Sequence, residues 1–108
     1  MSHYTDHHTE TMDGFEIVFS TTYETMHPRD HFMPEDVEEY LEGIESGKYE
    51  WFVARVQAVK NGIALGTDYL GGCLYESPMQ FVKDSGYYEE MVQNAIKEAE
   101  ANIQALTV

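Results

Sequence analysis

The stretch YEWFVARVQAVKNGIALGTDYL, residues 49–70, constrains the fold more than any other part of the chain. Its first half alternates two sets of side chains, which would face opposite sides of a strand: Phe52, Ala54, Val56 and Ala58 in one set, and Trp51, Val53, Arg55, Gln57 and Val59 in the other. Asn61-Gly62 follows, and this pair favours a type I′ turn, in which both central residues need positive φ. Ile63, Leu65, Thr67 and Tyr69 then alternate. We predict a β-hairpin whose turn is Asn61-Gly62.

Helical patterns lie on both sides of this hairpin. In residues 34–47, Pro34 suits the first helical position and Gly47 suits the C-terminal stop. An apolar stripe with helical spacing joins them, made of Val37, Tyr40, Leu41 and Ile44. After the hairpin, Ser77 and Pro78 are typical of the start of a short helix. A long helix is expected over residues 87–106, with a core-facing stripe of Tyr88, Met91, Val92, Ala95, Ala99, Ile103 and Leu106.

Residues 14–24, GFEIVFSTTYE, are rich in β-branched and aromatic residues and predict one further strand. The expected fold class is therefore α+β: a small antiparallel sheet of about three strands, packed on one face by the acidic helix over 34–47 and by the long C-terminal helix. Residues 1–13 are polar and are expected to form a mobile tail. Residues 14–108 are expected to form a single domain with one modest core.

The charge of the chain narrows the class of partner. Twenty Asp and Glu residues face six Lys and Arg, for a formal net charge of -14. Such a charge disfavours direct binding to nucleic acid or to an anionic membrane, because like charges repel. It favours a basic protein or ribonucleoprotein as partner. We expect the chain to act as a monomer or a homodimer.

The N-terminus and the cysteine content indicate the cellular location of the protein. MSHYTDHHTETMDG has neither the basic segment nor the apolar segment of a signal peptide. No apolar run approaches the ~20 residues of a transmembrane helix. A single cysteine cannot form an internal disulfide. We therefore expect a cytoplasmic protein, and one in the host cytoplasm if a phage encodes it.

Cys73, the only cysteine in the sequence, is a candidate catalytic nucleophile. A catalytic thiol needs a base within hydrogen-bond reach, usually a histidine. Acidic surroundings raise the pKa of a thiol rather than lower it, so we expect Cys73 to be buried and structural. The nearby Gly66, Gly71 and Gly72 lack the pattern of a phosphate-binding loop and are expected to serve turns and a bulge.

Two groups of histidines could bind a metal ion. His27 and His31 have i, i+4 spacing, which would place both on one face of a helix, but Pro28 makes a helix doubtful there. His3, Asp6, His7 and His8 lie in the expected tail, where no second shell would orient them. We expect both groups to be surface residues, and we expect no cofactor.

The clearest candidate site is the outward face of the 34–47 helix. Five carboxylates share it: Glu35, Glu38, Glu39, Glu42 and Glu45. Neighbours in this set lie about 5–6 Å apart, which resembles the spacing of phosphates along a nucleic-acid strand. Further acids, Glu89, Glu90, Glu98 and Glu100, are expected on the last helix. Trp51 and Tyr69, on the hairpin, are the expected short-range anchors beside this charge.

In its size, its acidity, its single cysteine and its WFVARVQAVKNGIALG hairpin preceding helices, the chain resembles the small acidic proteins that phages use against host defences. This resemblance to anti-CRISPR and anti-restriction proteins implies a non-enzymatic inhibitor. It implies binding to a basic, nucleic-acid-binding surface of a host defence protein or ribonucleoprotein, partly by nucleic-acid mimicry.

Two other hypotheses belong to different classes. The chain could be a small enzyme that uses Cys73 with a histidine, or a metal site at His27 and His31. It could also be a regulatory or dimerisation domain whose charge only keeps it in solution. Salt-sensitive binding to a basic partner would favour the inhibitor, whereas loss of activity in a folded Cys73→Ala variant would favour the enzyme.

Overall fold

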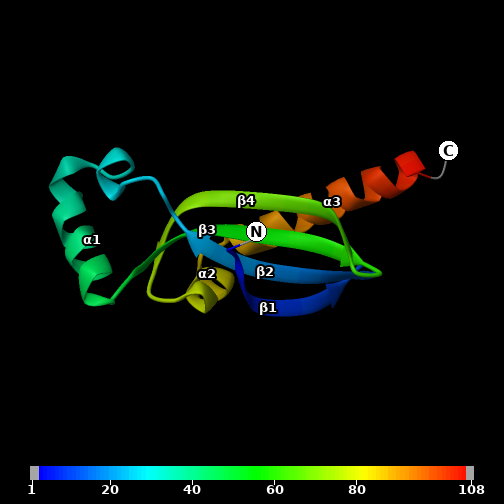
Figure 1. The fold of residues 1–108 in the computed structure, drawn as a ribbon, viewed down its shortest axis with the longest axis horizontal. Helices are drawn as coiled ribbons and strands as arrows, with labels where there is room; N and C mark the ends of the chain where they lie inside the picture. Colours follow the sequence, from blue (N-terminus) through cyan, green and yellow to red (C-terminus); the bar gives the residue numbers. More distant parts are fainter. Residues whose placement is uncertain (1–2, 107–108) are drawn as a thin grey trace.

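The computed structural model describes residues 3–106. In this part of the chain, four strands form one antiparallel sheet with the order β1-β2-β3-β4, and the helices lie between or after them (Figure 1). The elements are β1 (Thr5–Met12), β2 (Phe15–Tyr23), the 3-10 helix η1 (Pro28–Asp30), α1 (Pro34–Ser46), β3 (Glu50–Lys60), β4 (Ile63–Tyr75), α2 (Pro78–Asp84) and α3 (Tyr87–Leu106). The α+β class is confirmed.

Two tight turns connect the outer strands to the inner ones. The predicted turn is confirmed: Asn61 and Gly62 have φ of 54° and 78°, and Lys60 pairs with Ile63. The second turn is Asp13-Gly14, with φ of 54° and 84°, between the paired Met12 and Phe15. Both turns have the positive φ at two residues that a type I′ turn needs.

The expectation of about three strands is wrong, because the sheet has a fourth. The expectation of a mobile tail over residues 1–13 is wrong for residues 5–12, which form β1; residues 1–2 of that range, and 107–108 of the expected domain, lie outside the described chain. The sequence TDHHTETM hides this strand because Met12 is its only large apolar residue. The Asp-Gly turn after it was the signal that could have revealed it.

Polar contacts, rather than apolar packing, hold β1 in place. The Glu10 carboxylate accepts a hydrogen bond of 2.7 Å from the hydroxyl of Tyr88 on α3. On the other face of the sheet, the fully buried Ser20 hydroxyl donates to Asp6 Oδ1 at 2.6 Å. The Arg55 guanidinium, whose carbon lies 3.9 Å from the Tyr4 ring centroid, donates to the same hydroxyl at 3.4 Å. Hydrogen bonds of this kind offset the burial of polar groups.

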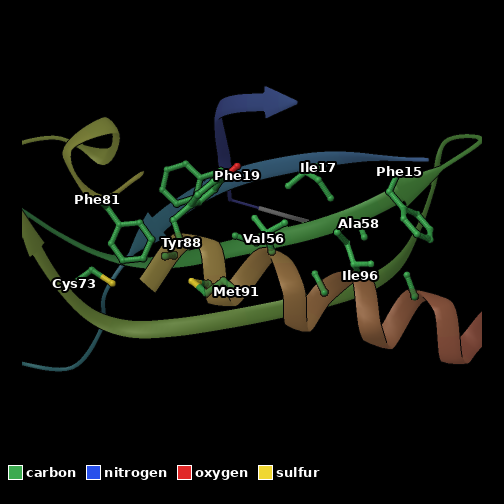
Figure 2. Packing of buried hydrophobic residues seen from close by; sticks show 14 of the residues in the cluster. Phe15, Ile17, Phe19, Val56, Ala58, Cys73, Phe81, Tyr88, Met91 and Ile96 are labelled. Carbon is green, nitrogen blue, oxygen red and sulfur yellow. The ribbon is translucent and has the colours of Figure 1, made fainter. Parts of the chain in front are cut away.

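The core lies between the sheet and the helices α2 and α3 (Figure 2). The predicted inward face of β3 is confirmed, since Phe52, Ala54, Val56 and Ala58 are all buried. Phe19 of β2 stacks on Phe81 of α2 at 5.6 Å between ring centroids. Aromatic packing of this kind adds to the hydrophobic stabilisation of a small core.

α3 crosses β3 and β4 with one buried stripe. Five of its seven predicted core positions are buried and Ile103 is half-buried. Leu106 is 78% exposed, because the last turns of α3 extend past the sheet (Figure 1). Ile96, which the prediction omitted, is buried.

The expected packing of α1 on a face of the sheet is wrong. α1 lies beyond the end of the sheet, next to the end of β2 and the start of β3 (Figure 1). Among the described residues, its main element contact is with η1. Its bounds were predicted correctly, and Gly47 ends it with φ of 85°.

Candidate functional site

The five predicted carboxylates of α1 all remain exposed to solvent. Val37 is only 2% exposed and faces the opposite side of the helix, so the acidic face is turned outward. Glu38 forms an ion pair with Arg29 of η1, with 2.6 Å between Oε1 and Nη2. Both side chains are more than half exposed, so the pair contributes about 0–1 kcal/mol to stability. Arg29 neutralises part of the charge that the sequence placed on this face.

Backbone-directed hydrogen bonds fix the chain that leads into α1. Glu24 Oε1 accepts the N–H of Gly72 at 2.7 Å, and Glu24 Oε2 accepts the N–H of Met26 at 3.1 Å. The indole N–H of Trp51 donates to the carbonyl of Met26 at 2.8 Å. One carboxylate and one indole thus attach this segment to β3 and β4.

An aromatic cluster continues from this attachment to α1. The Trp51 ring lies 5.5 Å from His31 and 5.4 Å from Phe32, between centroids, and Phe32 lies 4.6 Å from Tyr40 of α1. Trp51 was predicted as an anchor for a partner. In the structure it is partly exposed, and its indole N–H and ring contacts also help to position α1.

Tyr69, the second predicted anchor, lies apart from α1. It is 57% exposed and pairs with Arg55, four strand residues from Trp51, or about 13 Å along the sheet. Its ring lies 6.4 Å from that of Tyr4, on the face of the sheet opposite α3. The structure therefore does not bring Tyr69 and the acidic face of α1 together.

Gly71 and Gly72 form a bulge in β4, opposite Val53 of β3. Gly72 has φ of 67°, and a methyl group there would lie 2.7 Å from Cε1 of His31. Glycine is needed for both reasons: the left-handed backbone and the close approach of the imidazole. β4 continues through this bulge to Tyr75 instead of ending before it.

Cys73 follows the bulge and faces the core. It is 3% exposed, and its thiol donates to the carbonyl of Leu70 at 3.3 Å. Burial raises the pKa of the thiol to about 11, so it is protonated at neutral pH. A nucleophilic thiol needs the reverse, a lowered pKa and access to solvent. This environment supports the structural interpretation of Cys73.

The histidines have separate partners. His27 Nδ1 accepts the N–H of Arg29 at 3.1 Å and caps η1, whereas His31 packs on Trp51. His7 bonds Thr21 at 2.7 Å, and His8 lies 3.2 Å from Glu10. Within residues 3–106, no group of three or more His, Cys, Asp or Glu side chains could hold a metal ion.

Two hollows lie at the base of α1. The first is a cavity of about 490 Å³ between α1 and the ends of β1, β2 and β3. The second, of about 480 Å³, follows the C-terminal half of α1 and is lined by Glu39, Glu42, Gly43, Glu45, Ser46, Lys48 and Tyr49. Tyr49 also lines the first cavity, so the two hollows share this residue. Sequence reasoning had identified neither.

The acids of α3 are distributed differently. Glu98 accepts the backbone N–H of Thr67 at 3.1 Å, and Asn102 donates to the carbonyl of Leu65 at 2.7 Å. These side chains occupy backbone groups of the edge strand β4, which reduces its tendency to pair with another chain. Glu89, Glu90 and Glu100 are exposed.

Among the helices in residues 3–106, none combines the length and the apolar character needed to cross a membrane. Comparison of the chain with family models, curated proteins and solved structures finds no match.

Proposed function

We propose that the protein is a non-enzymatic inhibitor that binds a basic, nucleic-acid-binding surface of another protein through the acidic face of α1. The carboxylates of α1 take the place of phosphates in this complex. The resemblance to phage anti-defence proteins makes a host defence protein or ribonucleoprotein the expected partner.

The observation that carries the proposal is the position of α1. The helix stands beyond the end of the sheet and keeps Glu35, Glu39, Glu42 and Glu45 exposed, while Val37 packs inward. Repulsion between like charges at i, i+3 and i+4 destabilises a helix by a few tenths of a kcal/mol per pair. Attachment through Glu24 and Trp51 holds the segment that leads into the helix that carries the carboxylates. Charges carried on a folded helix lose less backbone entropy on binding than those of a flexible acidic tail would.

The test separates this face from the charge of the whole molecule. In one variant, Glu35, Glu42 and Glu45 of α1 are changed to Gln; in the matched control, Glu89, Glu90 and Glu100 of α3 are changed to Gln. Both variants remove three charges from exposed helix positions. Binding of each to a nona-arginine peptide is measured by calorimetry at low and at physiological salt.

We expect the α1 variant to bind the peptide about 10-fold more weakly than the parent, and the α3 variant to lose about 3-fold or less. The difference should shrink at higher salt, because screening acts over about 8–10 Å. Circular dichroism should show both variants folded, since the Val37 side of α1 is unchanged. Equal losses of affinity in the two variants would contradict the proposal and would mean that the acidic face of α1 is only a solvated surface.

A further inference from the structure

We infer that the 490 Å³ cavity at the base of α1 binds the guanidinium or ammonium group of a basic side chain. The inference rests on the proposed function and identifies where one basic residue of the partner would insert. The cavity lies within the size range of small-ligand sites in proteins.

The walls of the cavity come from four parts of the chain. β1 and the residues before it contribute His3, Thr5 and His7, and the end of β2 contributes residues 21–24. The end of α1 and the start of β3 complete it with Ile44, Gly47 and residues 49–52. Because Ile44 of α1 lines the cavity, a partner bound along α1 would lie beside it.

The lining has the chemistry of a cation site. Besides His3 and His7, the lining includes four aromatic residues, Tyr23, Tyr49, Trp51 and Phe52, and two acidic residues, Glu24 and Glu50. Among the described residues, no Lys or Arg lines it. A cation is attracted both to the face of an aromatic ring and to a carboxylate. Tyr23 is 89% exposed, so its ring is accessible to a ligand that enters the cavity.

The neighbouring hollow shows the same chemistry with the chain's own cation in place. The Lys48 ammonium lies 5.1 Å from the centroid of the Tyr49 ring, in the hollow that Glu39, Glu42 and Glu45 line. The first cavity offers Tyr49, Trp51, Glu24 and Glu50 without such an internal cation. The partner's basic side chain would supply it.

The walls are already in position before a ligand binds. Glu24 is held by the N–H groups of Gly72 and Met26, and Trp51 by the carbonyl of Met26. The Tyr49 ring packs so closely on α1 that a methyl group at Gly43 would overlap it. A preformed site of this kind binds without a large ordering penalty.

The chain contains one tryptophan, so its fluorescence reports directly on this cavity. The probes are N-acetyl-arginine amide and its neutral analogue N-acetyl-citrulline amide, which have nearly the same shape. Both are titrated over millimolar concentrations at about pH 8.

The arginine probe should change the Trp51 fluorescence saturably, and the citrulline probe should not. Glu50→Gln should lower the affinity for the arginine probe about 3-fold or more. Gly43→Ala should lower it by a similar factor, because the added methyl group displaces Tyr49. Glu89→Gln, on the distant helix α3, is the control and should leave binding unchanged. Equal responses to both probes, or no saturable response to arginine, would overturn the inference.

The two proposals can fail separately. The variant of α1 with Glu35, Glu42 and Glu45 changed to Gln should keep its affinity for the single arginine probe within about 2-fold, because none of these residues lines the cavity. If this variant loses nona-arginine binding while the parent shows no response to the arginine probe, the acidic face is supported and the cavity site is wrong.

Discussion

Gly66 of β4 lies directly against the backbone of α3, and it offers a sharp test of the fold. It pairs with Ala58 and is buried beneath α3. A methyl group at this position would overlap the carbonyl oxygen of Ala95 and lie 2.7 Å from the backbone nitrogen of Ala99. Both atoms belong to the helix backbone, so no side-chain rotation can relieve the contact.

The magnitude follows from this geometry. Ordinary contact begins at 3.4 Å, so α3 must retreat from β4 by at least 0.7 Å at Ala99, and by more at Ala95. Overpacking of this kind typically destabilises by about 1–3 kcal/mol. If α3 moves as a unit, it also loses contacts at Val92 and Ile96. The destabilisation by Gly66→Ala is therefore expected near the upper end of this range. A loss of about 2–3 kcal/mol corresponds to a melting temperature lower by roughly 10–20 °C for a domain of this size.

The assay is thermal and urea unfolding followed by circular dichroism, with Gly71→Ala as the matched control in the same strand. The nearest atom to a methyl group at Gly71 is Oε1 of Glu24, at 2.8 Å, which is a single side-chain atom rather than helix backbone. We expect the control to lose about 1 kcal/mol or less. Equal stability of the parent and Gly66→Ala would refute the packing of α3 on β4 described here.

Two further predictions concern buried side chains. Native Cys73 should react with a disulfide reagent far more slowly than Cys73 of the unfolded chain. The free energy of unfolding should fall as pH rises above about 9, because the unfolded thiol ionises there while the native thiol, with its pKa of about 11, stays protonated. A folded Cys73→Ala variant that no longer binds the nona-arginine peptide would contradict the structural role. Val56→Asp should destabilise by roughly 3–5 kcal/mol, because it buries an unpaired charge between β3 and α3; an unchanged melting temperature would show that the faces of β3 are reversed.

Features that depend on neighbouring residues could be predicted from the sequence. The Asn61-Gly62 turn, the burial of one face of β3, the bounds of α1 and the Ser77 cap of α2 all follow from local patterns. Turn and cap chemistry involves residues a few positions apart, and alternation is read within a single strand. The exposed acidic face of α1 follows for the same reason.

Features that depend on distant partners required the tertiary structure. β1 is polar, and the inward-facing Glu10 is satisfied by Tyr88, 78 residues later in the chain. The stripe of α1 predicts burial but not its location, and only the contacts of Trp51 with Phe32 and Met26 place the helix beyond the end of the sheet. Those contacts also give Trp51, an expected partner anchor, a part in positioning α1. A periodic pattern specifies which face of an element is buried, whereas the surface that buries it is set by long-range packing.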